Sequence, residues 1–174
     1  FKTILQALVR AGLNRTATIG FTTNLTVWDS QVIDLLKQFR VNLGMSIESF
    51  DVVNDYVRWP GKLPMVLEIL DKWQEVAQQH SWLMQLRTTP TLFTVGSLPS
   101  VYDYAWSRRI SVESCNFLTE PAFMRPAVLP ASYRQPIIDR MKSWLDQHSV
   151  SGDTVINIRN PNVSQLQNYQ DLQS

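Results

Sequence analysis

Polar side chains of the kinds that bind ligands occur in four short groups, each directly after an apolar run of the chain. The groups are Thr22-Thr23-Asn24, Ser46-Ile47-Glu48, the residues near Thr94, and Glu113-Ser114-Cys115-Asn116. Hydroxyls, amides and carboxylates can hold a ribose, an amino acid or an amide backbone. The same residue types also cap helices and form turns, so the pattern alone leaves both interpretations open.

A further polar and aromatic stretch separates the second group from the next helical pattern. It reads Asn54-Asp55-Tyr56-Val57-Arg58-Trp59-Pro60-Gly61-Lys62, and we expect it to form a loop. Binding residues concentrate in loops of this kind, although a solvated loop without a ligand is the alternative. Arg58 can pair there with an acidic group. We expect Arg58 and Asn116 to contact a substrate.

Nucleophilic, metal-dependent and phosphate-loop chemistry have weaker support in the sequence. Cys115 is the single cysteine, which excludes a disulfide framework and a metal site built from several cysteines of this chain. His80 and His148 have no partner at a metal-ligand spacing, and the glycines are scattered singly. We therefore predict no metal site in this chain and a reducing, cytoplasmic compartment.

Alternating helix and strand patterns would position the four polar groups. Strand patterns occur at residues 16–22, 41–48, 82–95 and 110–118, and helical patterns at 1–9, 29–39, 64–73, 100–107 and 137–148. The alternation predicts an α/β fold with a parallel sheet, because a parallel crossover needs a helix. Ligands bind at the carboxyl ends of strands in such folds. Periodicity does not decide whether the sheet is flat or curved into a barrel.

The composition of the 174 residues predicts a folded domain rather than a disordered chain. Hydrophobic residues make up 44% and charged residues 18%. The net charge of +1 gives no signature of nucleic-acid binding, and no apolar run predicts a membrane span. We expect residues 1–148 to form the domain and residues 149–174 to be a polar tail or the start of a truncated element. Because the chain begins at Phe1, we expect it to be an excerpt of a longer protein.

The order of several motifs resembles the central part of radical S-adenosylmethionine enzymes, in particular their twitch-type branch. The motifs are Thr22-Thr23-Asn24, Ser46-Ile47-Glu48, Asp55-Tyr56-Val57-Arg58-Trp59-Pro60, Leu98-Pro99, and the spacing of Asn116, Pro121 and Leu129-Pro130. That family has a Thr-Asn-Gly type turn, then a Ser-Ile-Asp type strand end, then a loop of the Tyr-x-Arg kind. Here Leu25 replaces the glycine and Glu48 replaces the aspartate. The resemblance covers residues 1–148.

The resemblance implies the second half of a partial (β/α)6 TIM-like barrel, with helices on one face of the sheet. It implies that Thr22 and Ser46 contact S-adenosylmethionine, that Asn24 shapes the turn at the cofactor, and that Glu48 supplies an acidic acceptor. The family cleaves this cofactor reductively at a 4Fe-4S cluster and abstracts hydrogen from a substrate. The cluster needs a Cys-x-x-x-Cys-x-x-Cys motif, which this chain lacks, so the cluster and its electron donor would act in a longer parent. The substrate, whether a small molecule, a peptide or a protein side chain, stays open.

Two other functions remain as alternatives. One is a non-catalytic α/β binding or structural module, in which the polar strand ends are caps. The other is a barrel hydrolase that uses Glu48 and Glu113 as an acid–base pair. A three-cysteine motif encoded upstream of Phe1 would discriminate between these alternatives and the radical enzyme.

Overall fold

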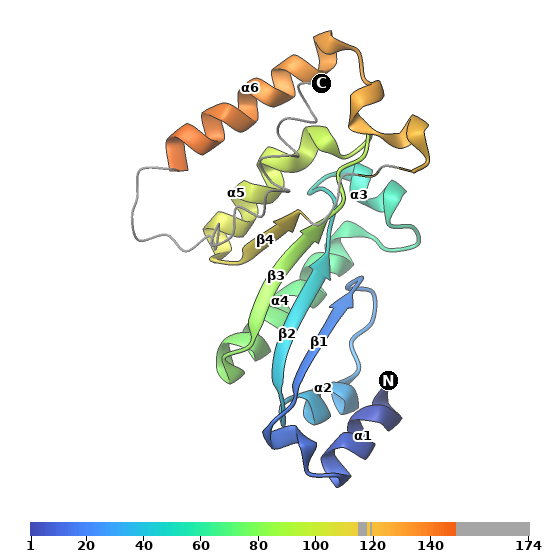
Figure 1. Ribbon diagram of the computed structural model, residues 1–174, viewed down its shortest axis with the longest axis vertical. Coiled ribbons are helices and arrows are strands. Elements are labelled where there is room, and N and C mark those ends of the chain that lie inside the picture. Colours follow the sequence, from blue (N-terminus) through green and yellow to red (C-terminus); the bar gives the residue numbers. More distant parts are fainter. Residues whose placement is uncertain (115–117, 119, 149–174) are drawn as a thin grey trace. The chain divides into compact units, whose positions relative to one another are not determined.

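The computed structural model describes residues 1–114, 118 and 120–148, and within them helices alternate with strands (Figure 1). The elements are α1 (Lys2–Arg10), β1 (Thr18–Thr23), α2 (Ser30–Leu36), β2 (Arg40–Ser46), α3 (Val52–Val57), α4 (Leu63–His80), β3 (Leu83–Thr88), α5 (Leu98–Arg108), β4 (Ser111–Ser114) and α6 (Ala131–His148). The four strands form one parallel sheet in the order β1-β2-β3-β4. This confirms the predicted α/β class and the parallel sheet.

The chain divides into two compact units, which we describe separately. Unit 1 consists of Phe1–Ser46 and Gly61–Gln85, and unit 2 consists of Ile47–Pro60 and the chain from Leu86 onward. The tail predicted for residues 149–174 lies outside the described residues.

In unit 1, the pairing of β1 with β2 places polar and apolar residues on opposite faces. Thr22 lies opposite Gly44 in the parallel register. Leu43 and Met45 are buried, whereas Thr22 is exposed. Because side chains alternate along a strand, Ser46 shares its face with Gly44 and therefore with Thr22. The two hydroxyl residues thus lie on the face opposite the buried apolar side chains.

The apolar face of unit 1 packs against α4 through aromatic rings. Trp73 of α4 is 4% exposed, and its ring centroid lies 5.9 Å from that of Phe21 in an edge-on arrangement. Trp28, in the segment after β1, packs against the same indole, with 5.2 Å between the two ring centroids. Such edge-on pairs add specific geometry to hydrophobic burial. They fix the position of the chain at the carboxyl end of β1.

The helices α2 and α4 of unit 1 begin close to residues 29 and 64, where the predicted helical patterns begin. Asp29 caps α2, and its carboxylate accepts hydrogen bonds from the backbone N–H groups of Gln31 and Val32 at 2.9 and 3.2 Å. Pro64 lies in the first turn of α4, where its missing N–H costs nothing.

In unit 2, α5 and α6 are joined through a buried apolar cluster. Val95, Leu98, Ile137 and Ile138 form its core. Trp144 of α6 adds a polar link, because its indole N–H donates to Asp103 of α5 at 2.6 Å. This packing fixes the first half of α6 against the segment that follows β3.

The loop that we predicted for residues 54–62 is in part a helix, because α3 covers Val52–Val57. Its N-cap is Asp51, whose carboxylate accepts from the N–H of Val53 at 2.8 Å. The Ser49 hydroxyl in turn donates to the same carboxylate at 2.8 Å. An aspartate at the N-cap stabilises the start of a helix, because its carboxylate accepts a backbone N–H that has no partner within the helix. The polar stretch is therefore an ordered helix followed by a turn.

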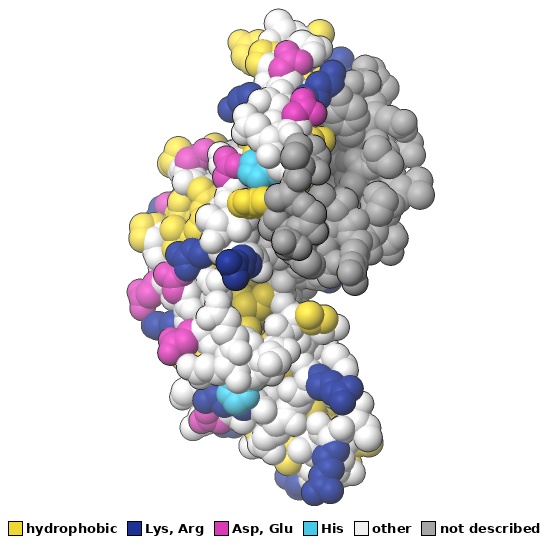
Figure 2. All heavy atoms as spheres, turned by 90° about the vertical axis from the view of Figure 1, so that its left-hand side faces the viewer, with side chains coloured by type: hydrophobic (Ala, Val, Ile, Leu, Met, Phe, Trp, Pro, Cys, Tyr) yellow, Lys and Arg dark blue, Asp and Glu magenta, His cyan; other side chains and the backbone are white. Residues whose placement is uncertain are grey.

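No helix among the described residues combines the length and the apolar character needed to cross a bilayer. Over much of the face shown in Figure 2, basic and acidic side chains are interspersed, as expected for a net charge of +1.

Candidate functional site

An open hollow of about 650 Å³ lies in unit 1 at the carboxyl ends of β1 and β2. Its polar lining comes from both strand ends and the turn after β1, namely Thr22, Thr23, Asn24, Asp29 and Ser46. Its apolar lining consists of Phe1, Phe21, Val27, Val32, Ile33 and Trp73. Small-molecule sites commonly have this mixture of an apolar wall and a few polar groups. Three residues predicted from the sequence, Thr22, Asn24 and Ser46, therefore line one hollow.

The Ser46 hydroxyl is available to a ligand in this hollow. Its side chain is partly buried, and no hydrogen bond joins its hydroxyl to any other described residue. A hydroxyl carries one donor and two acceptor positions, all of which a ligand can use here. Thr22 is more exposed and lines the same hollow.

Asn24 has a structural role in the turn. Its side-chain oxygen accepts from the backbone N–H of Thr26 at 3.3 Å and from the Thr26 hydroxyl at 2.7 Å. This is the side-chain turn that asparagine forms after strands. Asn24 thus stabilises the turn that lines the hollow.

Leu25 adopts a backbone conformation that glycine normally supplies. Its φ is 59°, in the left-handed region, and its side chain is 0% exposed. A non-glycine residue there costs roughly 1 kcal/mol or more. Burial of the leucine side chain offsets this cost. The chain therefore forms a glycine-type turn at position 25 without a glycine.

The acidic residue that lines the hollow, Asp29, is engaged by the fold. Its carboxylate caps α2 through the two backbone bonds described above. It therefore contributes negative charge to the rim, while its hydrogen-bonding role is structural.

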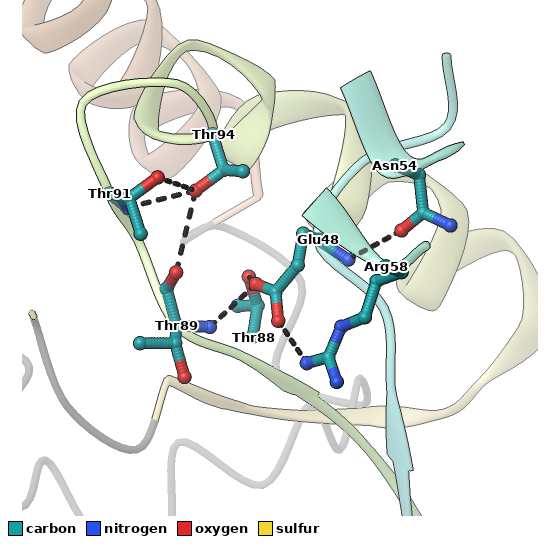
Figure 3. Close-up of polar contacts among 7 residues, drawn as sticks. All are labelled: Glu48, Asn54, Arg58, Thr88, Thr89, Thr91 and Thr94. Atoms are coloured by element: carbon teal, nitrogen blue, oxygen red, sulfur yellow. Dashed lines mark hydrogen bonds and ion pairs between the residues drawn. The ribbon is translucent and has the colours of Figure 1, made fainter. Parts of the chain in front are cut away.

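Glu48 is the centre of a second polar group, which lies wholly in unit 2 (Figure 3). The residue is 4% exposed, and one carboxylate oxygen forms an ion pair with Arg58. The other oxygen accepts from the Thr88 hydroxyl at 2.9 Å and from the Thr89 backbone N–H at 2.7 Å. A buried carboxylate is tolerated only with such partners. The network ties the segment after β2 to the end of β3.

Asn54 on α3 completes the support of Glu48. Its side-chain oxygen accepts from the backbone N–H of Glu48 at 3.0 Å, and it is 1% exposed. Its own backbone N–H donates to the Ser49 hydroxyl at 3.1 Å. Arg58 is the C-cap of α3 and follows Asn54 by four residues, so both side chains lie on the side that meets Glu48.

Arg58 meets an acidic group, as the sequence suggested, but that group belongs to the protein. Its guanidinium pairs with Glu48, and its side chain is 29% exposed. Sequence analysis missed the threonines at positions 88 and 89 as partners. The only signal for them was a run of hydroxyl residues at a strand end.

Thr94 stabilises the turn after β3. Its hydroxyl accepts from the backbone N–H of Thr91 at 2.8 Å and donates to the carbonyl oxygen of Thr89 at 3.4 Å (Figure 3). The third polar group of the sequence is thus built from local hydrogen bonds.

The fourth polar group is only partly described. Glu113 on β4 pairs with Arg87 on β3 at 2.8 Å, with both side chains partly exposed. Glu48 and Glu113, the acid–base pair of the hydrolase alternative, are thus each joined to an arginine of the chain. Cys115 and Asn116 lie outside the described residues, so the substrate contact predicted for Asn116 stays a prediction.

The described residues offer no group of three or more His, Cys, Asp and Glu side chains placed to hold a metal ion. A 4Fe-4S cluster needs three thiolates, and the sequence contains one cysteine. The donor set of this chain therefore does not fit a cluster. The chain matches no protein-family model, and it matches no curated protein.

Proposed function

We propose that the chain is the second half of the catalytic barrel of a radical S-adenosylmethionine enzyme. One observation carries the proposal: the hydroxyl residues of two neighbouring parallel strands, Thr22 and Ser46, line the same hollow at the carboxyl ends of those strands. These are the two residues that the family resemblance assigns to the cofactor. The sheet order β1-β2-β3-β4 is the order that consecutive strands have in a barrel wall.

The residues of the hollow fit the nucleoside part of S-adenosylmethionine. Its volume of about 650 Å³ is within the roughly 300–1,000 Å³ of small-molecule sites. The Ser46 hydroxyl has no hydrogen-bond partner among the described residues, and Thr22 adds a second hydroxyl. We propose that these hydroxyls hold the ribose. Asn24 and Leu25 act indirectly, because they fix the turn that places Thr22.

Glu48 has a positioning role in this proposal. Both of its carboxylate oxygens are already bonded within unit 2, to Arg58, Thr88 and Thr89. Glu48 therefore holds the segment that precedes α3 against the end of β3 within unit 2. Pre-organised loops lower the entropy that a ligand must pay on binding.

The cofactor supplies the chemistry of hydrogen abstraction when it is cleaved reductively, and this chain supplies orientation. Because the cluster ligands are not among its 174 residues, they would come from another part of the parent protein, which would also receive the electron donor. The substrate remains a small molecule, a peptide or a protein side chain.

The first test is iron–sulfur reconstitution of the protein translated from the complete coding sequence, beside the 174-residue chain. We expect the complete protein to bind iron and sulfide and to turn brown, and the 174-residue chain to stay colourless. A complete coding sequence without a three-cysteine motif would exclude the proposal.

The second test measures the affinity of the complete protein for S-adenosylmethionine. Ser46→Val removes the free hydroxyl, and the loss of one hydrogen bond should weaken binding about tenfold. Thr18→Val is the matched control, because Thr18 is exposed at the start of β1 and does not line the hollow. Equal affinities of the two variants would refute the role of Ser46 while leaving the family assignment open to the first test.

A further inference from the structure

We infer that a second hollow, in unit 2, binds a small organic carboxylate with an apolar body. The hollow has a volume of about 340 Å³ and lies between residues 92–96, which follow β3, and the first half of α6. This volume is at the lower end of the roughly 300–1,000 Å³ typical of small-molecule sites. The inference goes beyond the proposed function and does not depend on it.

The floor of this hollow is part of the buried core. Val95 and Ile137 line it, and they are 1% and 8% exposed. Both belong to the cluster that joins α6 to α5. Close-packed residues of this kind have little freedom to collapse into the hollow. The floor of the hollow is therefore a fixed feature of unit 2.

Two aromatic residues form the walls. Tyr133 of α6 is 68% exposed and Phe93 is 43% exposed, and both line the hollow. The Phe93 ring is held by Tyr56 of α3, with 5.7 Å between the ring centroids and an angle of 75°. Exposed aromatic rings beside an apolar floor favour an aromatic or aliphatic ligand body.

Arg140 is the charged residue of the lining. Tyr133, Pro136, Ile137 and Arg140 follow the spacing i, i+3, i+4 and i+7, so they share one face of α6. The guanidinium donates to the carbonyl oxygen of Gly96 across the hollow at 3.3 Å. No carboxylate among the described residues pairs with Arg140. Most of its five N–H donors therefore remain for a ligand.

The combination of these groups defines the ligand. The guanidinium fork matches a carboxylate in geometry and charge, and a cationic ligand would be repelled. The apolar floor and the aromatic walls stabilise a hydrocarbon or aromatic body. They do not stabilise a small inorganic anion, which has no apolar surface to bury. A carboxylate attached to a ring or a short alkyl chain satisfies both parts of the hollow.

Calorimetric titration of the 174-residue chain with indole-3-propionate and with its primary amide tests the inference. The two probes have the same body, and only the first is charged. We expect the carboxylate to bind about tenfold more tightly, because a charge-assisted pair to arginine is stronger than a neutral hydrogen bond. Arg140→Gln should remove this difference and leave the affinity for the amide unchanged. Lys142→Gln, on the same helix but outside the lining, should change neither affinity.

Three results would overturn the inference. They are equal affinities for the carboxylate and the amide, an effect of Lys142→Gln as large as that of Arg140→Gln, and binding of inorganic phosphate as tight as that of indole-3-propionate. A dimer whose formation excludes both probes would show that a second copy of the chain covers the hollow, and this too would overturn the inference. Gly96→Leu gives an independent check, because a β-carbon at Gly96 would lie 3.9 Å from Cδ1 of Ile137 and a larger side chain would enter the hollow. We expect this variant to bind neither indole-3-propionate nor its amide.

Discussion

Ser46 and Glu48 are two residues apart in the sequence, yet they have different roles in units 1 and 2. The Ser46 hydroxyl lines an open hollow and has no bonding partner among the described residues. The Glu48 carboxylate is 4% exposed and has three donors from its own unit. A polar residue at a strand end is thus a candidate for ligand binding only where the fold leaves its polar atoms unused. Residue type alone does not separate the two cases.

The largest expected effect is the loss of stability when the internally bonded carboxylate is removed. Glu48→Ala leaves the guanidinium of Arg58 and the N–H of Thr89 without their acceptor. We expect the free energy of unfolding to fall by about 3 kcal/mol, at the low end for a broken buried pair because the Arg58 side chain is 29% exposed. Urea denaturation measures this value.

Glu113→Ala is the control for that variant, because it removes a partly exposed carboxylate paired with Arg87. We expect it to cost less than about 1 kcal/mol. If Glu48→Ala and Glu113→Ala lowered the free energy of unfolding equally, the buried Glu48 carboxylate would stabilise the fold no more than the partly exposed Glu113 carboxylate, and the comparison would be wrong.

The next effect concerns the glycine-type turn beside the hollow. At Leu25, we expect Gly to be more stable than Ala by about 1 kcal/mol, because φ is 59° and glycine adopts this conformation without strain. At Leu36, a buried residue of α2, the order should reverse by about the same amount, because glycine is a poor helix former. Thermal unfolding of the four variants gives both comparisons. The same order at both positions would show that the turn is not strained.

A smaller effect distinguishes the two hydroxyl groups. Thr88→Val removes the hydroxyl that donates to Glu48, and we expect a loss of about 1 kcal/mol. Ser46→Val removes a hydroxyl without an internal partner, and we expect a change within about 0.5 kcal/mol. Urea denaturation of both variants is the measurement. A large loss for Ser46→Val would mean that its hydroxyl is structural, and the difference between the two units would disappear.

The smallest effect is a pH dependence on the exposed side of α4. Lys72 donates to Glu68 at 2.7 Å, and this hydrogen bond and the lysine charge lower the pKa of the Glu68 carboxyl. The folded state therefore holds fewer protons than the unfolded state, so the stabilisation is present above the unfolded pKa and is lost as the pH falls through the folded pKa. Glu68→Gln should be slightly less stable than the parent at pH 7 and equally stable in strong acid. The urea midpoints of Glu68→Gln and the parent protein, measured between pH 7 and strong acid, test this prediction. A difference in midpoint that persists in strong acid would contradict it.

The sequence by itself determined the alternation of helices and strands and the starts of α2 and α4. The alternation of polar and apolar residues predicted β1 and β2. The helical patterns that begin at Asp29 and Pro64 predicted α2 and α4. These features depend on neighbours within about one helical turn, so they can be recognised without the rest of the fold. The same local reasoning failed at α3, where a dense polar stretch conceals a capped helix.

The tertiary structure alone decided which polar residues are used internally. Arg58 finds its acceptor ten residues earlier, and Thr88 reaches the same carboxylate from forty residues away. The left-handed conformation of Leu25 likewise depends on the buried space for its side chain. Such partnerships arise because a buried polar group must be satisfied by whatever the folded chain brings near it. The period of a sequence pattern fixes the face on which a residue lies, and packing fixes what that residue meets there.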